Sequence, residues 1–227
     1  MRNFVVPILA VVFLLPTSAP VDAQTPLRID FNADNRDMQM GWVSIMDGSS
    51  WPVAEAIATD LSASGSVSLD IRPLVGAERV WISRGSIEVG FYVTQSNLLR
   101  DFLFIYAYGA DGLVVTVDGL RSGPYTFTSY HHDPTYSDHG AIDVYIADAG
   151  EEQLVAEGLV QSTGHSPSEI AVAETPFKIV GDGPVTIRIM SVPNSGNGIA
   201  INGFEIAPRT QISSEAKSWS SIKSLYQ

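Results

Sequence analysis

Hydrophobic and polar residues alternate with a period of two along much of the chain. From Ser66 to Ile71, and again from Leu113 to Asp118, every second residue is aliphatic, which places one face of each strand against a core. Similar short segments recur between residues 27 and 206, and helical periodicity is almost absent among them. Turn signals separate these segments about every ten residues. The pattern therefore predicts an all-β fold, a jelly roll or β-sandwich.

The same pattern gives three local expectations that the structure can test. Residues 54–61 have a spacing that fits two helical turns. The apolar, aromatic run 98–108 is expected to be a buried strand. Residues 177–180 and 185–192 flank a Gly-Asp-Gly-Pro turn, and we expect them to form a hairpin.

The segment 113–146 carries the densest chemistry of the chain. Its alternation predicts strands at 113–118, 125–130 and 141–146, and the connection before the third strand holds three of the four histidines. If the protein has a binding site, we expect it here. The candidate ligand-binding residues of this connection are Tyr130, His131, His132, Asp133, Tyr136, Asp138 and His139.

Three interpretations of this cluster are open. In the first, Tyr130 and Tyr136 stack on the apolar face of a sugar while imidazoles and carboxylates bind its hydroxyl groups. In the second, His131, Asp133 and His139 bind a divalent metal ion, although their spacing matches no common zinc motif. In the third, the side chains only hold the loop together by hydrogen bonds.

The N-terminal residues 1–23 follow the pattern of a secretory signal peptide. Arg2 precedes an apolar run from Phe4 to Leu15, and small residues occupy the positions −1 and −3 before Gln24. We therefore expect cleavage before Gln24, with export to the periplasm or the extracellular space. The apolar run of 12 residues is shorter than the roughly 20 that cross a bilayer, so no membrane span is expected.

Residues 24–208 are expected to form one β-sandwich domain. The chain contains no cysteine, which excludes disulfides and thiolate metal sites. The domain holds 9 basic and 23 acidic side chains, a net charge of −14, with Lys178 as its only lysine. Such a surface repels nucleic acid and anionic polymers, so neutral polysaccharides or glycans are the expected partners.

Two further groups of residues are candidates for a site. Asp30, Asp34 and Asn35 form an oxygen-rich segment that suits calcium. Trp51 lies in a predicted loop before a proline, where its ring can serve as a stacking platform for a sugar, and Trp42 and Trp81 are weaker candidates of the same kind.

The last segment, 209–227, differs from the β domain. Trp219, Ile222 and Leu225 recur at helical spacing after a polar stretch. One interpretation is a tail that docks to a partner or to a sorting machinery. The other is a helix lying against its own domain, or a frayed end.

Five motifs in order along the chain carry a resemblance to a known family. They are Ile29–Asn32, Arg100–Phe102, Gly119–Tyr125, Ser129–Asp133 and Ile201–Ile206. This set resembles the galactose-binding-like β-sandwich modules of secreted bacterial proteins, including malectin-like and carbohydrate-binding modules. The resemblance implies non-catalytic glycan binding by loops at one end of the sandwich, often beside a structural calcium ion.

We therefore expect a secreted, lectin-like carbohydrate-binding module with a structural calcium ion. The alternatives are a metal- or carboxylate-dependent glycan hydrolase and a structural protein of the cell surface or extracellular matrix. The sequence contains no nucleophile elbow, no phosphate-binding glycine loop, no His-Glu-x-x-His motif and no cysteine nucleophile, so an enzyme is the weaker expectation.

Overall fold

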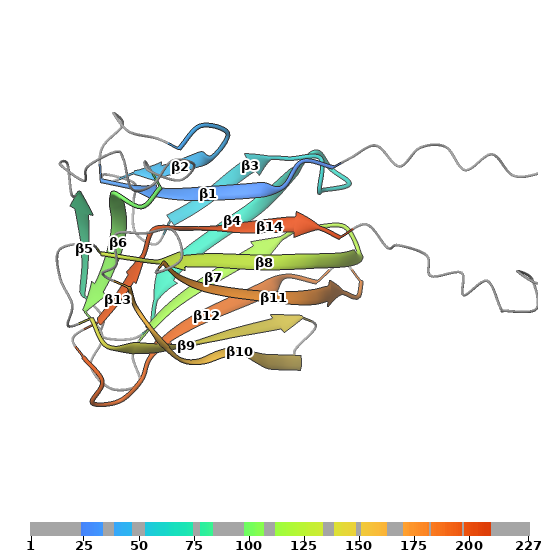
Figure 1. The fold of residues 1–227 in the computed structure, drawn as a ribbon. Helices are drawn as coiled ribbons and strands as arrows, with labels where there is room; N and C mark the ends of the chain where they lie inside the picture. Colours follow the sequence, from blue (N-terminus) through green and yellow to red (C-terminus); the bar gives the residue numbers. More distant parts are fainter. Residues whose placement is uncertain are drawn as a thin grey trace, which may run out of the picture.

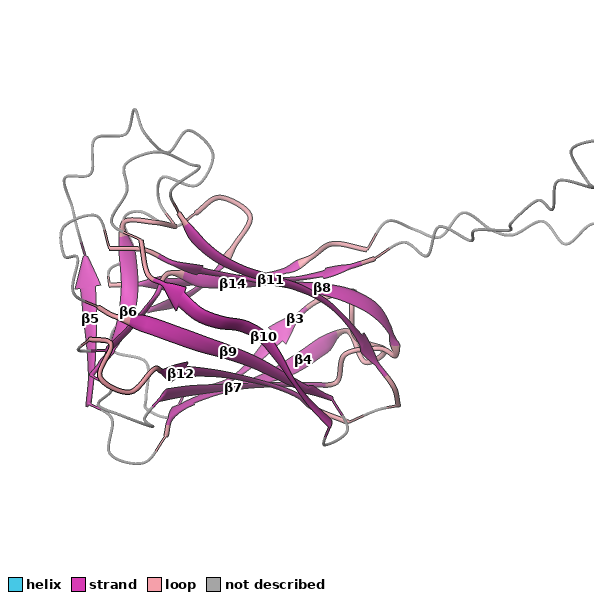
Figure 2. Cartoon of the chain, turned by 60° about the horizontal axis from the view of Figure 1, so that its bottom comes forward, coloured by secondary structure: helices cyan, strands magenta, loops and turns pink. Residues whose placement is uncertain are grey.

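The computed structural model describes most of the expected β domain. All regular structure in the described residues is β-strand, which confirms the predicted all-β class (Figure 2). The signal peptide expected at 1–23 and the tail after Arg209 lie outside these residues. The part of the chain that is described contains no helix that could cross a membrane. The described residues are 24–33, 39–46, 53–74, 78–83, 98–106, 112–133, 139–148, 151–162, 170–181, 183–196 and 198–209.

Five strands form the first sheet. In sheet order they are β11 (Ala171–Ile179), β8 (Gly123–His131), β14 (Gly203–Pro208), β1 (Leu27–Asn32) and β2 (Val43–Met46). Neighbouring strands are antiparallel except β1 and β2, which are parallel. The sheet therefore joins the first and last strands of the domain near its centre.

Six strands form the second sheet, and all of its pairs are antiparallel. It packs against the first sheet to make the sandwich (Figure 1). In sheet order the strands are β10 (Glu151–Val160), β9 (Ala141–Asp148), β12 (Val185–Ser191), β7 (Gly112–Asp118), β4 (Ser66–Pro73) and β3 (Val53–Ala58).

A third, smaller sheet stands across one end of the sandwich (Figure 1). It consists of β13 (Gly198–Ile201), β6 (Asp101–Tyr106) and β5 (Glu78–Ser83) in antiparallel order. We call this sheet the cap. The start of β1 and the end of β14, which pair with each other, both lie at the end of the sandwich opposite the cap (Figure 1).

Aliphatic and aromatic side chains from both large sheets fill the space between them. Three aromatic side chains of the first sheet pack together in this core. The ring centroid of Phe204 lies 6.3 Å from that of Phe31 and 6.2 Å from that of Phe127. All three rings are buried, and the alternation along β1, β8 and β14 directs their neighbours to the opposite face. Burial of this apolar surface is the main stabilising contribution in a chain without disulfides.

The helix expected at 54–61 is wrong, because residues 53–58 form strand β3. Val53, Ile57 and Leu61 are buried and recur every fourth residue. This spacing fits one face of a helix, but it also fits a strand, because residues four apart in a strand point to the same side. Pairing of Val53 with Ile71 on the neighbouring strand decides in favour of the strand.

The hairpin expected at 177–192 is also wrong. Strand β11 pairs with β8 in the five-stranded sheet, whereas β12 pairs with β7 and β9 in the six-stranded sheet. The turn near Gly181 therefore carries the chain from one sheet to the other. The segments β7, β8 and β9 likewise lie in alternate sheets, so the predicted strands at 113–118, 125–130 and 141–146 are confirmed but span the sandwich.

Of the apolar run 98–108, residues 101–106 form a strand, and residues 107 and 108 lie outside the described residues. Residues 98–100 form a turn whose leucines, Leu98 and Leu99, are buried, and strand β6 then extends to Tyr106. Phe102 and Phe104 of this strand lie against the ring of His139, and this places β6 beside the histidine cluster.

Candidate functional site

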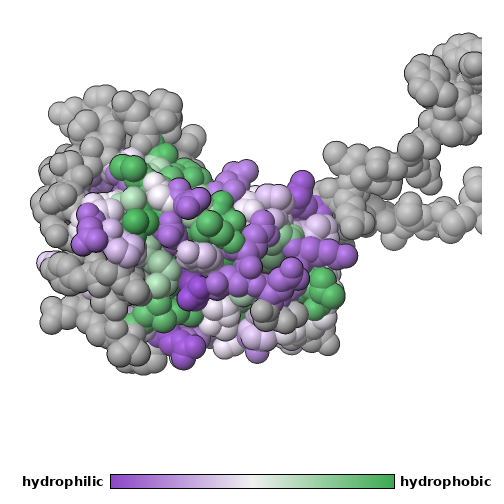
Figure 3. Space-filling view, turned by 90° about the horizontal axis from the view of Figure 1, so that it is seen from below, coloured by the Kyte–Doolittle hydropathy of each residue, from purple (hydrophilic) through white to green (hydrophobic). Residues whose placement is uncertain are grey.

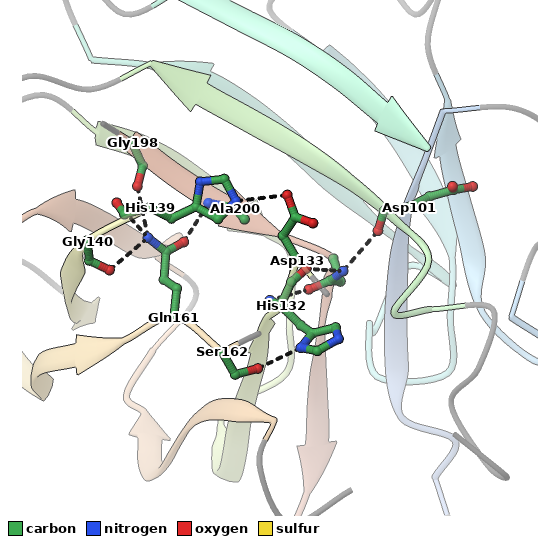
Figure 4. A network of polar contacts seen from close by, with 10 residues as sticks. Asp101, His132, Asp133, His139, Gly140, Gln161, Ser162, Gly198 and Ala200 are labelled. Atoms are coloured by element: carbon green, nitrogen blue, oxygen red, sulfur yellow. Dashed lines mark hydrogen bonds and ion pairs between the residues drawn. The ribbon is translucent and has the colours of Figure 1, made fainter. Parts of the chain in front are cut away.

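The histidine cluster lies where strand β8 ends against the cap (Figure 4). His131, His132 and Asp133 complete β8 and its exit, and His139 precedes β9. The Nε2 of His139 lies 2.9 Å from Oδ2 of Asp133, and because a carboxylate accepts, the imidazole N–H donates. This hydrogen bond ties together the two ends of the loop 134–138.

The ring of His139 is held on its other sides by aromatic residues of the cap. Its centroid lies 4.9 Å from that of Phe104 and 6.2 Å from that of Phe102. His139 is only 4% exposed and Asp133 is fully buried. The pair therefore connects the base of the loop to strand β6 without facing the solvent.

Gln161, which directly follows strand β10, fastens the same region from another direction. Its Nε2 donates to the backbone oxygens of His139, Gly140 and Gly198, at 3.2, 3.1 and 2.8 Å. Its Oε1 accepts from the backbone N–H of Ala200 at 2.6 Å. One buried side chain thus joins the start of β9 to the cap strand β13 (Figure 4).

Asn202, between β13 and β14, imitates a peptide group opposite His132. Its Oδ1 accepts from the N–H of His132 at 2.8 Å, and its Nδ2 donates to the carbonyl oxygen of His132 at 3.1 Å. The same Nδ2 donates to the carbonyl oxygen of Asp101 at 3.0 Å. Asn202 therefore extends the sheet past the end of β8 and links it to β6.

His131 is fully buried on the inner side of β8. Its Nδ1–H donates to the carbonyl oxygen of Ala200, and its Nε2 accepts from the hydroxyl of Ser129, both at 2.8 Å. Burial lowers the pKa of His131 from 6.5 to about 4, and the hydrogen bond to Ala200 opposes this shift only in part. At neutral pH this histidine is therefore uncharged.

His132 is fully buried as well, and its Nδ1 lies 2.6 Å from Oγ of Ser162. The backbone repeats this link, because the N–H of Asp133 donates to Ser162 O and the N–H of Ser162 donates to His131 O. The four residues His131, His132, Asp133 and His139 are therefore buried and bonded to other segments at the loop base. Their part in ligand binding stays a prediction. Among the described residues no group of three or more His, Cys, Asp or Glu side chains could hold a metal ion.

Tyr130 differs from its neighbours because it points away from the core. It is half-buried on the outer face of β8 and meets Trp42 edge-to-face, with the ring centroids 5.9 Å apart and the ring planes at 65°. Trp42 precedes strand β2 and is also half-buried. The structure thus places Tyr130, a predicted ligand-binding residue, against Trp42, a weaker candidate, beside the loop base.

Asp30 lies in a second buried polar cluster on the outer face of β1. Its Oδ2 accepts from the N–H of Gln39 at 2.8 Å, whereas Oδ1 has no hydrogen-bond partner in the described part of the chain. Burial raises the pKa of Asp30 from 3.8 to about 6. Gln39 and Asn32 lower that pKa in part, and the charge of Asp101 raises it further.

Five of the predicted site residues lie outside the described residues, so their part in the site stays a prediction: Tyr136, Asp138, Trp51, Asp34 and Asn35. In contrast, Gln161, Ser162 and Asn202 are central to the observed network, and sequence reasoning assigned them no role. Asn202 belongs to the motif Ile201–Ile206, so a local sequence signal for this residue exists. Gln161 has no local signal, because its four partners belong to segments distant in the chain.

Comparison with known proteins gives structural similarity only. No family model and no curated protein matches the chain. A carbohydrate-binding module of lichenase 5A from Cellvibrio mixtus, solved with cellotriose, is 12% identical with a TM-score of 0.37, and the match covers 69% of this chain and 98% of that chain. For a family 35 carbohydrate-binding module from Cellvibrio japonicus the identity is 16%, the TM-score 0.36 and the coverages 62% and 94%.

A larger protein is also similar. The plant receptor-like kinase FER is 9% identical with a TM-score of 0.49, and the match covers 84% of this chain but 44% of that chain. Several other similar structures are carbohydrate-binding modules, the class that the sequence motifs resemble.

The two shifted pKa values predict opposite effects of pH on stability. Ionisation of Asp30 destabilises the folded state as pH rises from 3.8 to about 6, because the folded-state pKa is the higher one. Protonation of His131 destabilises the folded state as pH falls from 6.5 to about 4, because its folded-state pKa is the lower one. Each effect is at most about 3 kcal/mol, so the two nearly cancel in the wild type.

Asp30→Asn removes only the first of these effects. Urea unfolding with a chelator present should show a wild-type free energy of unfolding that is nearly constant between pH 4 and 6.5. In the variant it should rise with pH by about 2–3 kcal/mol over that range. Asp118→Asn, at an exposed position, is the control and should follow the wild type. Parallel curves for wild type and Asp30→Asn would contradict the burial effect on Asp30.

Proposed function

We propose that this protein is an exported, non-catalytic carbohydrate-binding protein whose glycan site lies at the capped end of the sandwich. The observation that carries the proposal is the aromatic pair Trp42 and Tyr130, half-buried beside the loop base. The face of an aromatic ring suits the apolar side of a pyranose, and this pair brings two such rings together at the surface.

The surroundings of Tyr130 support a preorganised site. Tyr130 directly precedes the segment 131–133, which Asn202 and Ser162 hold by hydrogen bonds. Side chains that are already fixed lose little conformational entropy when a ligand binds. In this proposal Tyr136 and Asp138, on the loop between Asp133 and His139, supply further contacts to sugar hydroxyls.

The acidic surface favours neutral glycans at this site. A glycan hydrolase, the alternative function, would need two carboxyl groups flanking a bound sugar. Asp30 and Asp101 interact electrostatically, but both are fully buried and so face no bound polymer. A binding role therefore accounts better for the described residues than a catalytic one.

Substitution of the aromatic pair tests this proposal. Trp42→Ala and Tyr130→Ala should each weaken binding of a neutral oligosaccharide, selected on a glycan array, by about 5- to 150-fold in titration calorimetry. Tyr145→Ala, on the outer face of the other sheet, is the matched aromatic control and should bind as the wild type. Unchanged affinity in both test variants, with folding intact, would remove the pair from the site.

We propose in addition that a calcium ion stabilises the Asp30 cluster. Two buried oxygens, Oδ1 of Asp30 and Oδ1 of Asn32, have no hydrogen-bond partner among the described residues, and oxygens of this kind are calcium ligands. The neighbouring segment contains Asp34 and Asn35, the further ligands that the sequence suggests. A cation here would offset the cost of burying the Asp30 charge.

Thermal unfolding with calcium or with a chelator tests the ion directly. At about 100-fold excess over the dissociation constant, calcium should stabilise the protein by about 2.7 kcal/mol, which raises Tm by about 5–10 °C. Asp30→Asn should abolish this difference, and Asp118→Asn should keep it. Equal Tm values in calcium and in chelator would exclude a structural ion of this kind.

A further inference from the structure

A hollow lies at the opposite end of the sandwich from the histidine loop. It has a volume of about 400 Å³ and opens between the strands β9 and β10 of one sheet and β11 of the other. Asp148 pairs with Glu151 at the turn from β9 to β10, and Ile179 pairs with Gly123 at the start of β8. The groove is therefore separated from the loop base by the length of the sandwich.

The floor of this groove is apolar and fixed. Ile146 belongs to the hydrophobic core, and Phe177 is half-buried with its ring stacked on that of Tyr125 at a centroid distance of 5.7 Å and an interplanar angle of 27°. Tyr125 is itself anchored, because its hydroxyl donates to the carbonyl oxygen of Arg121 at 2.8 Å. A ligand would therefore meet a preformed aromatic surface.

Carboxylates line the groove above this floor. Asp148 Oδ2 accepts from the N–H of Val180 at 2.8 Å, while its Oδ1 is shielded from solvent and has no hydrogen-bond partner in the described residues. The side chain of Glu151 is exposed and makes no hydrogen bond or ion pair with any described residue. A charge that is shielded from solvent is screened less than an exposed one, so the field of Asp148 extends into the groove.

The remaining charges of the groove do not neutralise these two carboxylates. Glu152 is already engaged by Arg188, whose Nε and Nη2 donate to its two oxygens at 2.7 and 2.5 Å. Lys178 is the one cation that lines the groove among the described residues. With Gln153 it adds hydrogen-bond donors for hydroxyl groups. The groove thus combines an aromatic floor, hydroxyl-binding groups and an excess of negative charge.

The flanking strands argue against a peptide added to the sheet edge. Strand β11 has Pro176 at its centre, which lacks the N–H that a neighbouring strand would need. Strand β10 changes register twice, between Leu154 and Ala156 and between Ala156 and Leu159. A small hydroxylated ligand suits the volume and the lining better than an extended chain does.

We infer that this groove binds an oligosaccharide that carries free amino groups, with an ammonium group beside Asp148 and Glu151 and a sugar ring against Phe177. That the ligand is a glycan rests on the proposed function, while its amino groups follow from the charges of the groove. The face seen in Figure 3 carries separate hydrophobic patches among hydrophilic side chains, a mixture suited to sugars.

Titration calorimetry with three tetrasaccharides tests this inference. A β-1,4-linked glucosamine tetramer should bind about tenfold more tightly than its fully N-acetylated form or the glucose tetramer, because only its ammonium groups meet the carboxylates. Glu151→Gln and Asp148→Asn should each remove most of that preference. Glu157→Gln changes an exposed glutamate on the same strand and should keep it.

The outcomes separate this inference from the proposed function. Equal affinity for the three tetramers, or an equal loss in Glu157→Gln, would overturn it, since the attraction would then be absent or only general. Loss of glucosamine binding in Trp42→Ala, but not in Glu151→Gln, would place the amino sugar at the capped end and also overturn it. Binding of neutral glycans that depends on Trp42 alone would leave the proposed function intact.

Asp148→Asn is interpreted only if its Tm matches the wild type, and Glu151→Gln, at an exposed position, provides the test otherwise.

Discussion

The structure of the capped end depends on one constraint, that polar groups buried away from water must find hydrogen-bond partners. Backbone groups just after β8, just before β9 and at the first residues of β6 and β13 lie close together there. Asn202 and Gln161 supply the missing partners with their side-chain amides, which can donate and accept at once. Loss of either amide would leave several buried groups unpaired, at about 1–3 kcal/mol each.

This constraint explains why residues with catalytic chemistry serve a structural role here. His131, His132, Asp133 and His139 could act in many sites, but each is enclosed by the cap and bonded within the protein. Their arrangement fixes both ends of the loop 134–138 and the direction of Tyr130. Binding, in this account, belongs to groups that the network positions, and the acidic groove at the far end is independent of it.

Much of the fold was predictable, because alternation with a period of two specifies a strand and its inward face. The strands at 66–71 and 113–118 follow from that alone. The pairing of strands was not predictable, since β11 and β12 are neighbours in sequence yet their partners are distant in the chain. The sequence located the histidine cluster, but burial depends on the cap, and Gln161 acts through four contacts that no local pattern indicates.

Hydrogen exchange at the loop base measures the central claim most directly. The N–H of His132 donates to a side chain, and those of Asp133 and Ser162 join segments that belong to different sheets. If the network is closed as described, these amides exchange as slowly as those in the core of β8 and β14, because only large-scale unfolding exposes them. Exchange at the rate of exposed loops would show that the network opens readily, and that the histidines are accessible to a ligand after all.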